Sequence, residues 1–236
     1  MKNVLIVGSQ HGNELLGEKL YAYIMKQPPE AALHVAYVLA NPEARKRGIR
    51  FVESDMNRSF TRDDTYEAER AIRLKALVQD GNYDLVIDAH TTTVAQAPCL
   101  IISGIREDNK TYLRATHIKN IVVMKHEFLA QSLIGNVPRA VSVEVSNDDL
   151  CEKLFGKLHE DLLDFAKGTG SHPHKSVFVV EGLLEKGRLS DDQIAQLRNF
   201  EQSEAGFYPV LVGENSYKKQ TNYLGFLAKV KQEVTI

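Results

Sequence analysis

Positions 4–14 read VLIVGSQHGNE, a short apolar run that passes through a glycine into polar residues. Unbroken Val, Leu and Ile without polar alternation is typical of a strand buried on both faces of a sheet. His11 and Glu14 follow this run closely. Because open α/β sheets bind ligands at the carboxyl ends of their strands, the stretch predicts a first strand and one part of a site.

Three similar apolar runs follow, and helical patterns alternate with them. The predicted strands span 34–40, 85–89 and 140–145, and the predicted helices span 14–25, 68–77 and 149–166. Strands that alternate with amphipathic helices are typical of a parallel sheet. We therefore predict an α/β fold with a mixed, largely parallel sheet and helices on both faces.

The composition changes at residues 168–174, which read GTGSHPH and predict a loop. Beyond it lie two extended-looking apolar segments, 177–184 and 207–212. Pro209 interrupts the second segment and suits an edge strand or a bulge. We therefore predict a main domain over 1–168 and a small β-containing C-terminal unit over 169–236.

Composition narrows the classes of partner. The chain has 236 residues, of which 43% are hydrophobic, and a net charge of −2 without a long basic cluster, so we expect no nucleic-acid partner. The apolar run at residues 4–7, near the N-terminus, is far shorter than the apolar stretch of a signal peptide or a membrane span, and we expect no membrane partner. Cys99 and Cys151 are predicted to be buried free thiols, which favours the cytoplasm. The expected partner is a small molecule, and the oligomeric state stays open, a homo-oligomer included.

Three residues form a candidate metal site. His11 and Glu14, three apart, can converge on one ion in a tight turn, although such a pair alone is more often a surface contact. His90 ends another predicted strand, DLVIDAH at 84–90, at the same edge. Three protein ligands leave one position for water, as in catalytic zinc sites. The glycines near His11 match neither phosphate-binding motif, GxxxxGK[ST] or GxGxxG.

Two further segments carry chemistry. Residues 50–60 read RFVESDMNRSF and predict a loop with two arginines. A guanidinium can bind a carboxylate through two parallel hydrogen bonds, so the loop is a candidate for binding a substrate carboxylate. The alternative is a charged loop exposed to solvent. Glu144 lies within AVSVEV, an otherwise apolar predicted strand. Burying a carboxylate there costs free energy unless the residue has a functional role or a partner. An ion pair with an arginine is the alternative explanation for Glu144.

Together these segments resemble the aspartoacylase and succinylglutamate desuccinylase family of zinc-dependent, carboxypeptidase-like hydrolases. The matching pieces are HGNE at 11–14, NP at 41–42, DMNR at 55–58, DAHTT at 88–92 and VEV at 143–145. YPV at 208–210, followed by Glu214 and Tyr217, resembles the C-terminal segment of the aspartoacylase branch. The resemblance covers most of the chain and implies a zinc carboxypeptidase-like catalytic domain over 1–168, with 169–236 at the mouth of the active site.

The resemblance also implies catalytic roles. His11, Glu14 and His90 would hold one zinc ion per subunit. Glu144 would take a proton from the zinc-bound water and later protonate the leaving amine. Arg50 would polarise the substrate carbonyl and stabilise the oxyanion.

Substrate-binding roles follow from the same resemblance. Asn57 and Arg58 would bind the amino-acid carboxylate, Tyr217 would contact the substrate, and Asp55 would support a ligand. Aspartoacylases carry a further substrate-binding arginine upstream of the catalytic glutamate, and Arg139 is the candidate for it here. Without that arginine, a preference for a dicarboxylate substrate is open.

The predicted function is therefore metal-dependent hydrolysis of an N-acyl amino acid, with N-acetyl-aspartate as the first candidate, cleaved to acetate and aspartate. The alternatives are N-succinylglutamate, another N-acyl amino acid, or peptides cleaved by a zinc carboxypeptidase. A non-enzymatic metal-binding or amino-acid-binding module is the remaining alternative.

Overall fold

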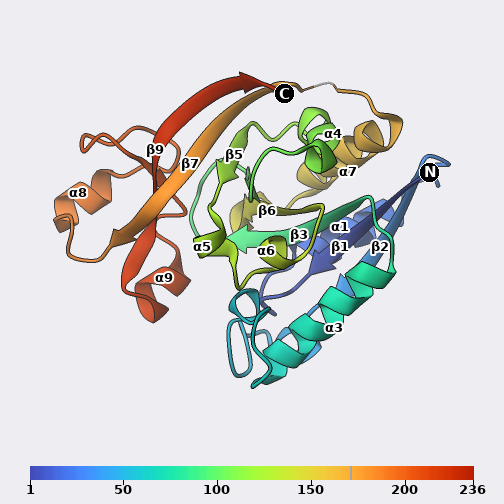
Figure 1. Cartoon of the computed structure of the whole chain (residues 1–236), viewed down its shortest axis with the longest axis horizontal. Helices are drawn as coiled ribbons and strands as arrows, with labels where there is room; N and C mark the ends of the chain where they lie inside the picture. Colours follow the sequence, from blue (N-terminus) through green and yellow to red (C-terminus); the bar gives the residue numbers. More distant parts are fainter. Residues whose placement is uncertain (171) are drawn as a thin grey trace.

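One nine-stranded sheet runs through the part of the chain that the computed structural model describes, residues 1–170 and 172–236, with 219 and 220 described by their backbone alone. Its strand order is β2-β1-β3-β6-β4-β5-β7-β9-β8 (Figure 1). The strands are β1 (Lys2–Gly8), β2 (Leu33–Leu39), β3 (Leu85–Thr92), β4 (Cys99–Ile102), β5 (Asn120–Val123), β6 (Ala140–Ser146), β7 (His174–Glu185), β8 (Tyr208–Val210) and β9 (Tyr223–Thr235).

Strand directions confirm the predicted mixed, largely parallel sheet. Strands β2, β1, β3 and β6 are parallel to one another, and β4 pairs with β6 in the antiparallel direction. Strands β4, β5 and β7 are again parallel, and β9 pairs antiparallel with both β7 and β8. The carboxyl ends of β1, β3 and β6 therefore meet at one edge of the sheet.

Helices cover both faces of the sheet. The helices are α1 (Leu16–Ile24), α2 (Pro42–Arg47), α3 (Tyr66–Asp80), α4 (Glu107–Ala115), α5 (His126–Leu129), α6 (Leu133–Asn136), α7 (Glu152–Lys167), α8 (Asp191–Gln196) and α9 (Asn215–Gln220), with 3-10 turns η1 (Met56–Arg58) and η2 (Asn147–Asp149). Helices α1, α4 and α7 pack one apolar core, and α3, α5 and α6 pack the other. None of the helices in the described ranges is long and apolar enough to cross a membrane.

The C-terminal segments extend the same sheet. Strand β7 pairs with β5, and β7 and β9 form a long, curved antiparallel pair at the upper left of Figure 1. Pro209 lies in β8, the edge strand, as predicted. The predicted loop at 168–174 includes Ser171, which lies outside the described residues. The division of the chain into units at residues 168 and 169 stays a prediction. The segments on both sides of it contribute strands to the same sheet.

Two sequence predictions are wrong in detail. Cys99 is buried, as predicted, but Cys151 is exposed because it lies just before the first residue of α7, at the surface. Helix α1 begins at Leu16 rather than at residue 14, because Glu14 belongs to the tight turn that follows β1.

Candidate active site

A tight turn after β1 holds His11 and Glu14. The Glu14 amide donates to the His11 carbonyl (3.0 Å), and the Ser9 hydroxyl donates to the Glu14 carbonyl (2.9 Å). Gly12 lies against α2 so closely that a Cβ there would come within 2.1 Å of the Ala44 carbonyl carbon. Only glycine fits this contact, so the position of the turn is set by the helix behind it.

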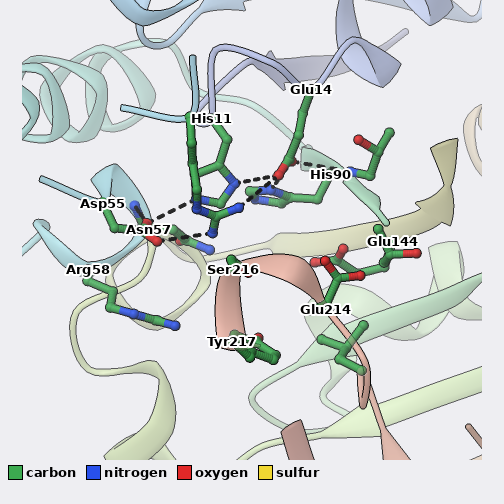
Figure 2. Close-up of a pocket in the computed structure, with 14 residues that line it drawn as sticks. His11, Glu14, Asp55, Asn57, Arg58, His90, Glu144, Glu214, Ser216 and Tyr217 are labelled. Atoms are coloured by element: carbon green, nitrogen blue, oxygen red, sulfur yellow. Dashed lines mark hydrogen bonds and ion pairs between the residues drawn. The ribbon is translucent and has the colours of Figure 1, made fainter. Parts of the chain in front are cut away.

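Glu14 lies between two imidazoles at the edge of the sheet (Figure 2). One carboxylate oxygen is 2.7 Å from His11 Nδ1, and the other is 2.8 Å from His90 Nδ1. All three side chains are buried, and one ligand atom from each lies within 4.8 Å of the others. Burial opposes ionisation of Glu14, but the two histidines outweigh it and hold the pKa of Glu14 well below its usual value. The predicted ligand set is therefore brought together.

Each imidazole has a carboxylate on its other nitrogen. His11 Nε2 is 2.9 Å from Asp55, and His90 Nε2 is 3.0 Å from Asp88. In metal sites, ligating histidines usually give their second nitrogen to a carboxylate or a carbonyl, which fixes the ring. Both Nδ1 atoms consequently face Glu14. This donor set of two imidazoles and one carboxylate fits zinc.

Arg50 joins the cluster from the loop after α2. Its guanidinium donates to Glu14 (3.3 Å) and to Asp55 (3.0 Å). Burial disfavours its charge, yet the two carboxylates raise the pKa of Arg50. Its Nε is buried without a hydrogen-bond partner in the described structure. Arg50 therefore has one donor, its Nε, that no described residue uses.

The loop that carries Arg50 and Asp55 is held by Glu67, a fully buried residue of α3. The Glu67 carboxylate accepts from the amides of Val52 (2.6 Å), Glu53 (3.1 Å) and Ser54 (3.1 Å). It also accepts from the Asn41 side chain (3.1 Å). One carboxylate thus fixes the backbone beside the cluster.

Glu144 lies beside His90, because their Cα atoms are partners in the β3–β6 register. Burial raises the pKa of Glu144 to about 7; His90 opposes this shift, and the neighbouring carboxylates add to it. Within the described residues Glu144 forms no ion pair, and its hydrogen bond comes from the Ser142 hydroxyl (3.3 Å). The alternative of an ion pair with an arginine therefore finds no support.

A pocket of about 70 Å³ joins these side chains. Its lining residues are His11, Glu14, Arg50, Asp55, Asn57, Arg58, His90, Thr91, Thr92, Glu144, Leu211, Glu214, Ser216 and Tyr217. In Figure 2, Asn57 and Arg58 lie across the pocket from Glu144 and Glu214. Eight of the nine predicted site residues are in this lining, and Arg139 is the one outside it.

Arg139 lies on the surface at the amino end of β6, in left-handed backbone (φ +59°), and donates to the Tyr83 carbonyl (3.1 Å). It precedes Glu144 by five residues, which is about 16 Å of extended chain at roughly 3.3 Å per residue. The structure therefore does not bring Arg139 to the other predicted residues.

The C-terminal segment reaches the pocket through a contact that the sequence did not indicate. Both Glu214 oxygens accept from Thr93, one from its amide (2.8 Å) and one from its hydroxyl (3.0 Å). The same hydroxyl accepts from the Asn215 amide (3.0 Å). Because Thr93 directly follows β3, this contact fastens Ser216 and Tyr217 of α9 to the strand that carries His90. We call it the Glu214–Thr93 clamp.

Comparisons with known proteins identify the family of the chain. Residues 1–203 match the family described as "Succinylglutamate desuccinylase/Aspartoacylase catalytic domain". A human "N-acyl-aromatic-L-amino acid amidohydrolase (carboxylate-forming)" is 34% identical over 123 residues, which cover 45% of this chain and 39% of that protein. A "Probable aspartoacylase" of Parasynechococcus marenigrum is 29% identical over 209 residues, which cover 74% of this chain and 66% of that protein. The chain thus spans about two fifths and about two thirds of these curated relatives.

Solved structures show the same fold. Murine aminoacylase 3 superposes with a TM-score of 0.72 at 21% identity, over 99% of this chain and 97% of that one. The succinylglutamate desuccinylase of Chromobacterium violaceum gives a TM-score of 0.69 at 16% identity, over 100% and 85% of the two chains. At these identities the likeness concerns the fold.

Proposed function

The chain belongs to the succinylglutamate desuccinylase/aspartoacylase family, and from that premise we propose that it hydrolyses the amide bond of N-acyl amino acids with one zinc ion per subunit. One observation carries the proposal. The buried His11–Glu14–His90 cluster shares a single pocket with a carboxylate of raised pKa, Glu144, and with a half-buried arginine, Arg58.

His11, Glu14 and His90 would hold the zinc ion, because their donor atoms converge and Asp55 and Asp88 orient the two imidazoles. When bound, zinc makes water more acidic and polarises a carbonyl group.

Glu144 would move the proton. It would take one proton from the attacking water and give it to the amide nitrogen as the C–N bond breaks. The water oxygen would end on the acyl carbon, so that the products are a carboxylic acid and a free amino acid. A pKa of about 7 suits a group that first accepts and then donates a proton near neutral pH.

The remaining pocket residues would bind and orient the substrate. Arg50 would donate its unpartnered Nε to the carbonyl oxygen as negative charge develops there. Asn57 and Arg58 would bind the amino-acid carboxylate, and Tyr217 would contact the substrate from α9.

Several N-acyl amino acids are candidate substrates. N-acetyl-aspartate is the prediction from the resemblance, and it depends on a second cation for its side-chain carboxylate, which Arg139 does not supply from its position. The names of the relatives include both an aspartoacylase and an N-acyl-aromatic-amino acid amidohydrolase. N-succinylglutamate and C-terminal peptides are the other candidates. We keep the cytoplasm and a small-molecule partner as predictions.

The test is amine release by the zinc-loaded protein from N-acetyl-aspartate, N-acetyl-phenylalanine, N-succinyl-glutamate and a dipeptide. Turnover of an acyl amino acid that disappears on zinc removal and returns on reloading is the expected result. Turnover of the dipeptide alone would favour a carboxypeptidase, and no turnover of any compound would favour a binding module.

A further inference from the structure

Gln10 is a buried residue of the turn after β1 that the proposed mechanism does not use. It lies between Ser9 and His11, is 1% exposed, and does not line the active-site pocket. Polar side chains are seldom buried so completely, and those that are usually have hydrogen-bond partners. The partners of its amide therefore indicate what Gln10 does.

The Gln10 amide faces the carboxylate that supports His90. Gln10 Nε2 donates to Asp88 Oδ1 (2.5 Å), and His90 Nε2 is 3.0 Å from the same oxygen. In the reversed amide orientation, the Gln10 oxygen would lie against the Asp88 oxygen, and two acceptors would face each other. The amide is therefore oriented as a donor to Asp88.

Both donors act on one oxygen of Asp88, which is itself 1% exposed. The other oxygen, Oδ2, has no hydrogen-bond partner in the described part of the chain, and the same holds for Gln10 Oε1. The described residues thus hold the carboxylate by its Oδ1 atom alone. Without Gln10, the hydrogen bond with His90 would be left to fix its rotation.

The orientation of Asp88 determines which nitrogen of His90 is available to a metal. When His90 is neutral, as metal ligation requires, it carries one ring hydrogen. Asp88 accepts a hydrogen from Nε2, so the lone pair is on Nδ1, which lies 2.8 Å from Glu14. Holding Asp88 therefore keeps Nδ1 where a ligand atom is needed.

The other histidine of the cluster is supported by a charged donor. His11 Nε2 is 2.9 Å from Asp55, whose second oxygen accepts from Arg50 (3.0 Å). Arg50 lines the pocket, where the proposed function uses it. Gln10 has the corresponding place behind Asp88, but it is neutral and lies outside the pocket lining. Its contact with Asp88 is therefore free of a second role toward the substrate.

We propose that Gln10 is a positioning residue of the metal site: its amide holds the Asp88 carboxylate on His90 and so keeps His90 Nδ1 directed toward Glu14. Gln10 acts through Asp88 and touches neither the substrate nor the metal. This inference rests on the zinc ligands of the proposed function and adds a residue to their support. Its test measures metal binding and does not depend on turnover.

Gln10→Met removes the donor and keeps a side chain of similar length. Zinc affinity, measured at pH 8 by competition with a chromophoric chelator, is expected to fall about tenfold. The visible absorption bands of the cobalt-loaded protein are expected to shift, because they report the geometry of the ligands. Gln10→Ser, which has a shorter side chain, is made in parallel and is expected to give the same result. Gln79→Met, at an exposed position of α3, is the matched control.

A double-mutant cycle distinguishes a positioning role from a purely structural one. Asp88→Asn is expected to weaken zinc binding about 10–100-fold. In that background, Gln10→Met is expected to weaken it by less than about twofold more, because the carboxylate that Gln10 holds is gone. An equal loss in both backgrounds overturns the inference. A loss of thermal stability with the zinc affinity and the cobalt spectrum of the wild type overturns it as well.

The outcomes also separate the inference from the proposed function. A wild-type protein that does not bind zinc contradicts the proposed ligand set, and the inference fails with it. Equal zinc affinity in the wild type and both Gln10 variants supports the ligand set and overturns the inference. Weaker zinc binding in both variants supports the inference, and a wild-type protein that then hydrolyses no N-acyl amino acid contradicts the proposed function alone.

Discussion

His90 and Glu144 face the same side of the sheet from adjacent positions on neighbouring parallel strands. Their separation is set by the hydrogen-bonded ladder between β3 and β6 rather than by a loop. Residues on regular strands are held more precisely than residues on loops, which favours a fixed distance between the proposed metal ligand His90 and the proposed base Glu144. The first prediction follows from this pair.

Glu144→Gln is expected to lower kcat by about 10²–10⁴-fold, because the amide retains the shape of the side chain but cannot carry the proton. Zinc content and thermal unfolding are expected to stay at wild-type values. Steady-state kinetics and metal analysis check this, with Glu181→Gln at the surface as the matched control. A Glu144→Gln protein with full turnover would return the site to the binding-module alternative.

Zinc is expected to bind more weakly at pH 6 than at pH 8. Burial opposes protonation of His11 and His90, but Glu14, Asp55 and Asp88 outweigh it and raise both pKa values in the metal-free protein. Metal ligation needs neutral imidazole, so protons compete with zinc as the pH falls. Competition with a chromophoric chelator measures the affinity, and His126→Ala, at an exposed position, is the control. An affinity that does not change with pH contradicts this account.

Glu67→Ala is expected to lower the free energy of unfolding by roughly 2–4 kcal/mol, because the amides of the Arg50 loop lose their acceptor. Urea unfolding of this variant measures the loss. Glu69→Gln on the exposed face of the same helix is the control, and an equal loss in both variants would contradict the assigned role.

The contribution of Glu67 is also expected to depend on pH. Burial opposes its ionisation, but the amides of Val52, Glu53 and Ser54 and the Asn41 side chain lower the pKa of Glu67 below its usual value. A lowered pKa in the folded state gives stability that is complete above the unfolded pKa and is lost as the pH falls through the folded pKa. The difference in unfolding free energy between wild type and Glu67→Gln should therefore shrink below about pH 4.5, and a constant difference would rule this out.

Breaking the Glu214–Thr93 clamp is expected to raise KM more than it lowers kcat, because the clamp positions Tyr217 without touching the metal ligands. Glu214→Ala and Thr93→Val should each reduce kcat/KM about tenfold, and Thr93→Ser should restore it. In a double-mutant cycle, Glu214→Ala is expected to add little to Tyr217→Phe. Additive losses would show that Glu214 acts independently of Tyr217.

The sequence predicted the central strands from local signals, and the same signals singled out four residues that the structure brings into one pocket: His11, Glu14, His90 and Glu144. The other four predicted residues that line this pocket came from the family resemblance: Arg50, Asn57, Arg58 and Tyr217. Long apolar runs mark β1, β3 and β6, and polar residues directly after or within those runs mark the site. Strands β4 and β5 have four residues each, which is too short for a period to emerge.

The remaining features depend on distant partners. Thr93 and Glu214 are 121 residues apart, and no local sequence pattern at either residue predicts their contact. Arg139 was predicted from its place upstream of Glu144, but a strand carries residues away from each other with every step. Strand direction therefore keeps Arg139 outside the pocket lining, and linear spacing alone does not contain that information.

The 121 residues that separate Thr93 from Glu214 also set the order in which the parts of the site are synthesised. At roughly 5–20 residues per second, a ribosome delivers Glu214 about 6–24 s after Thr93. His11, Glu14 and His90 have then already left the ribosome, and β6 also precedes Glu214 in the chain. The nascent chain thus presents the His11–Glu14–His90 cluster before the C-terminal residues that complete the pocket lining, among them Glu214 and Tyr217, are synthesised.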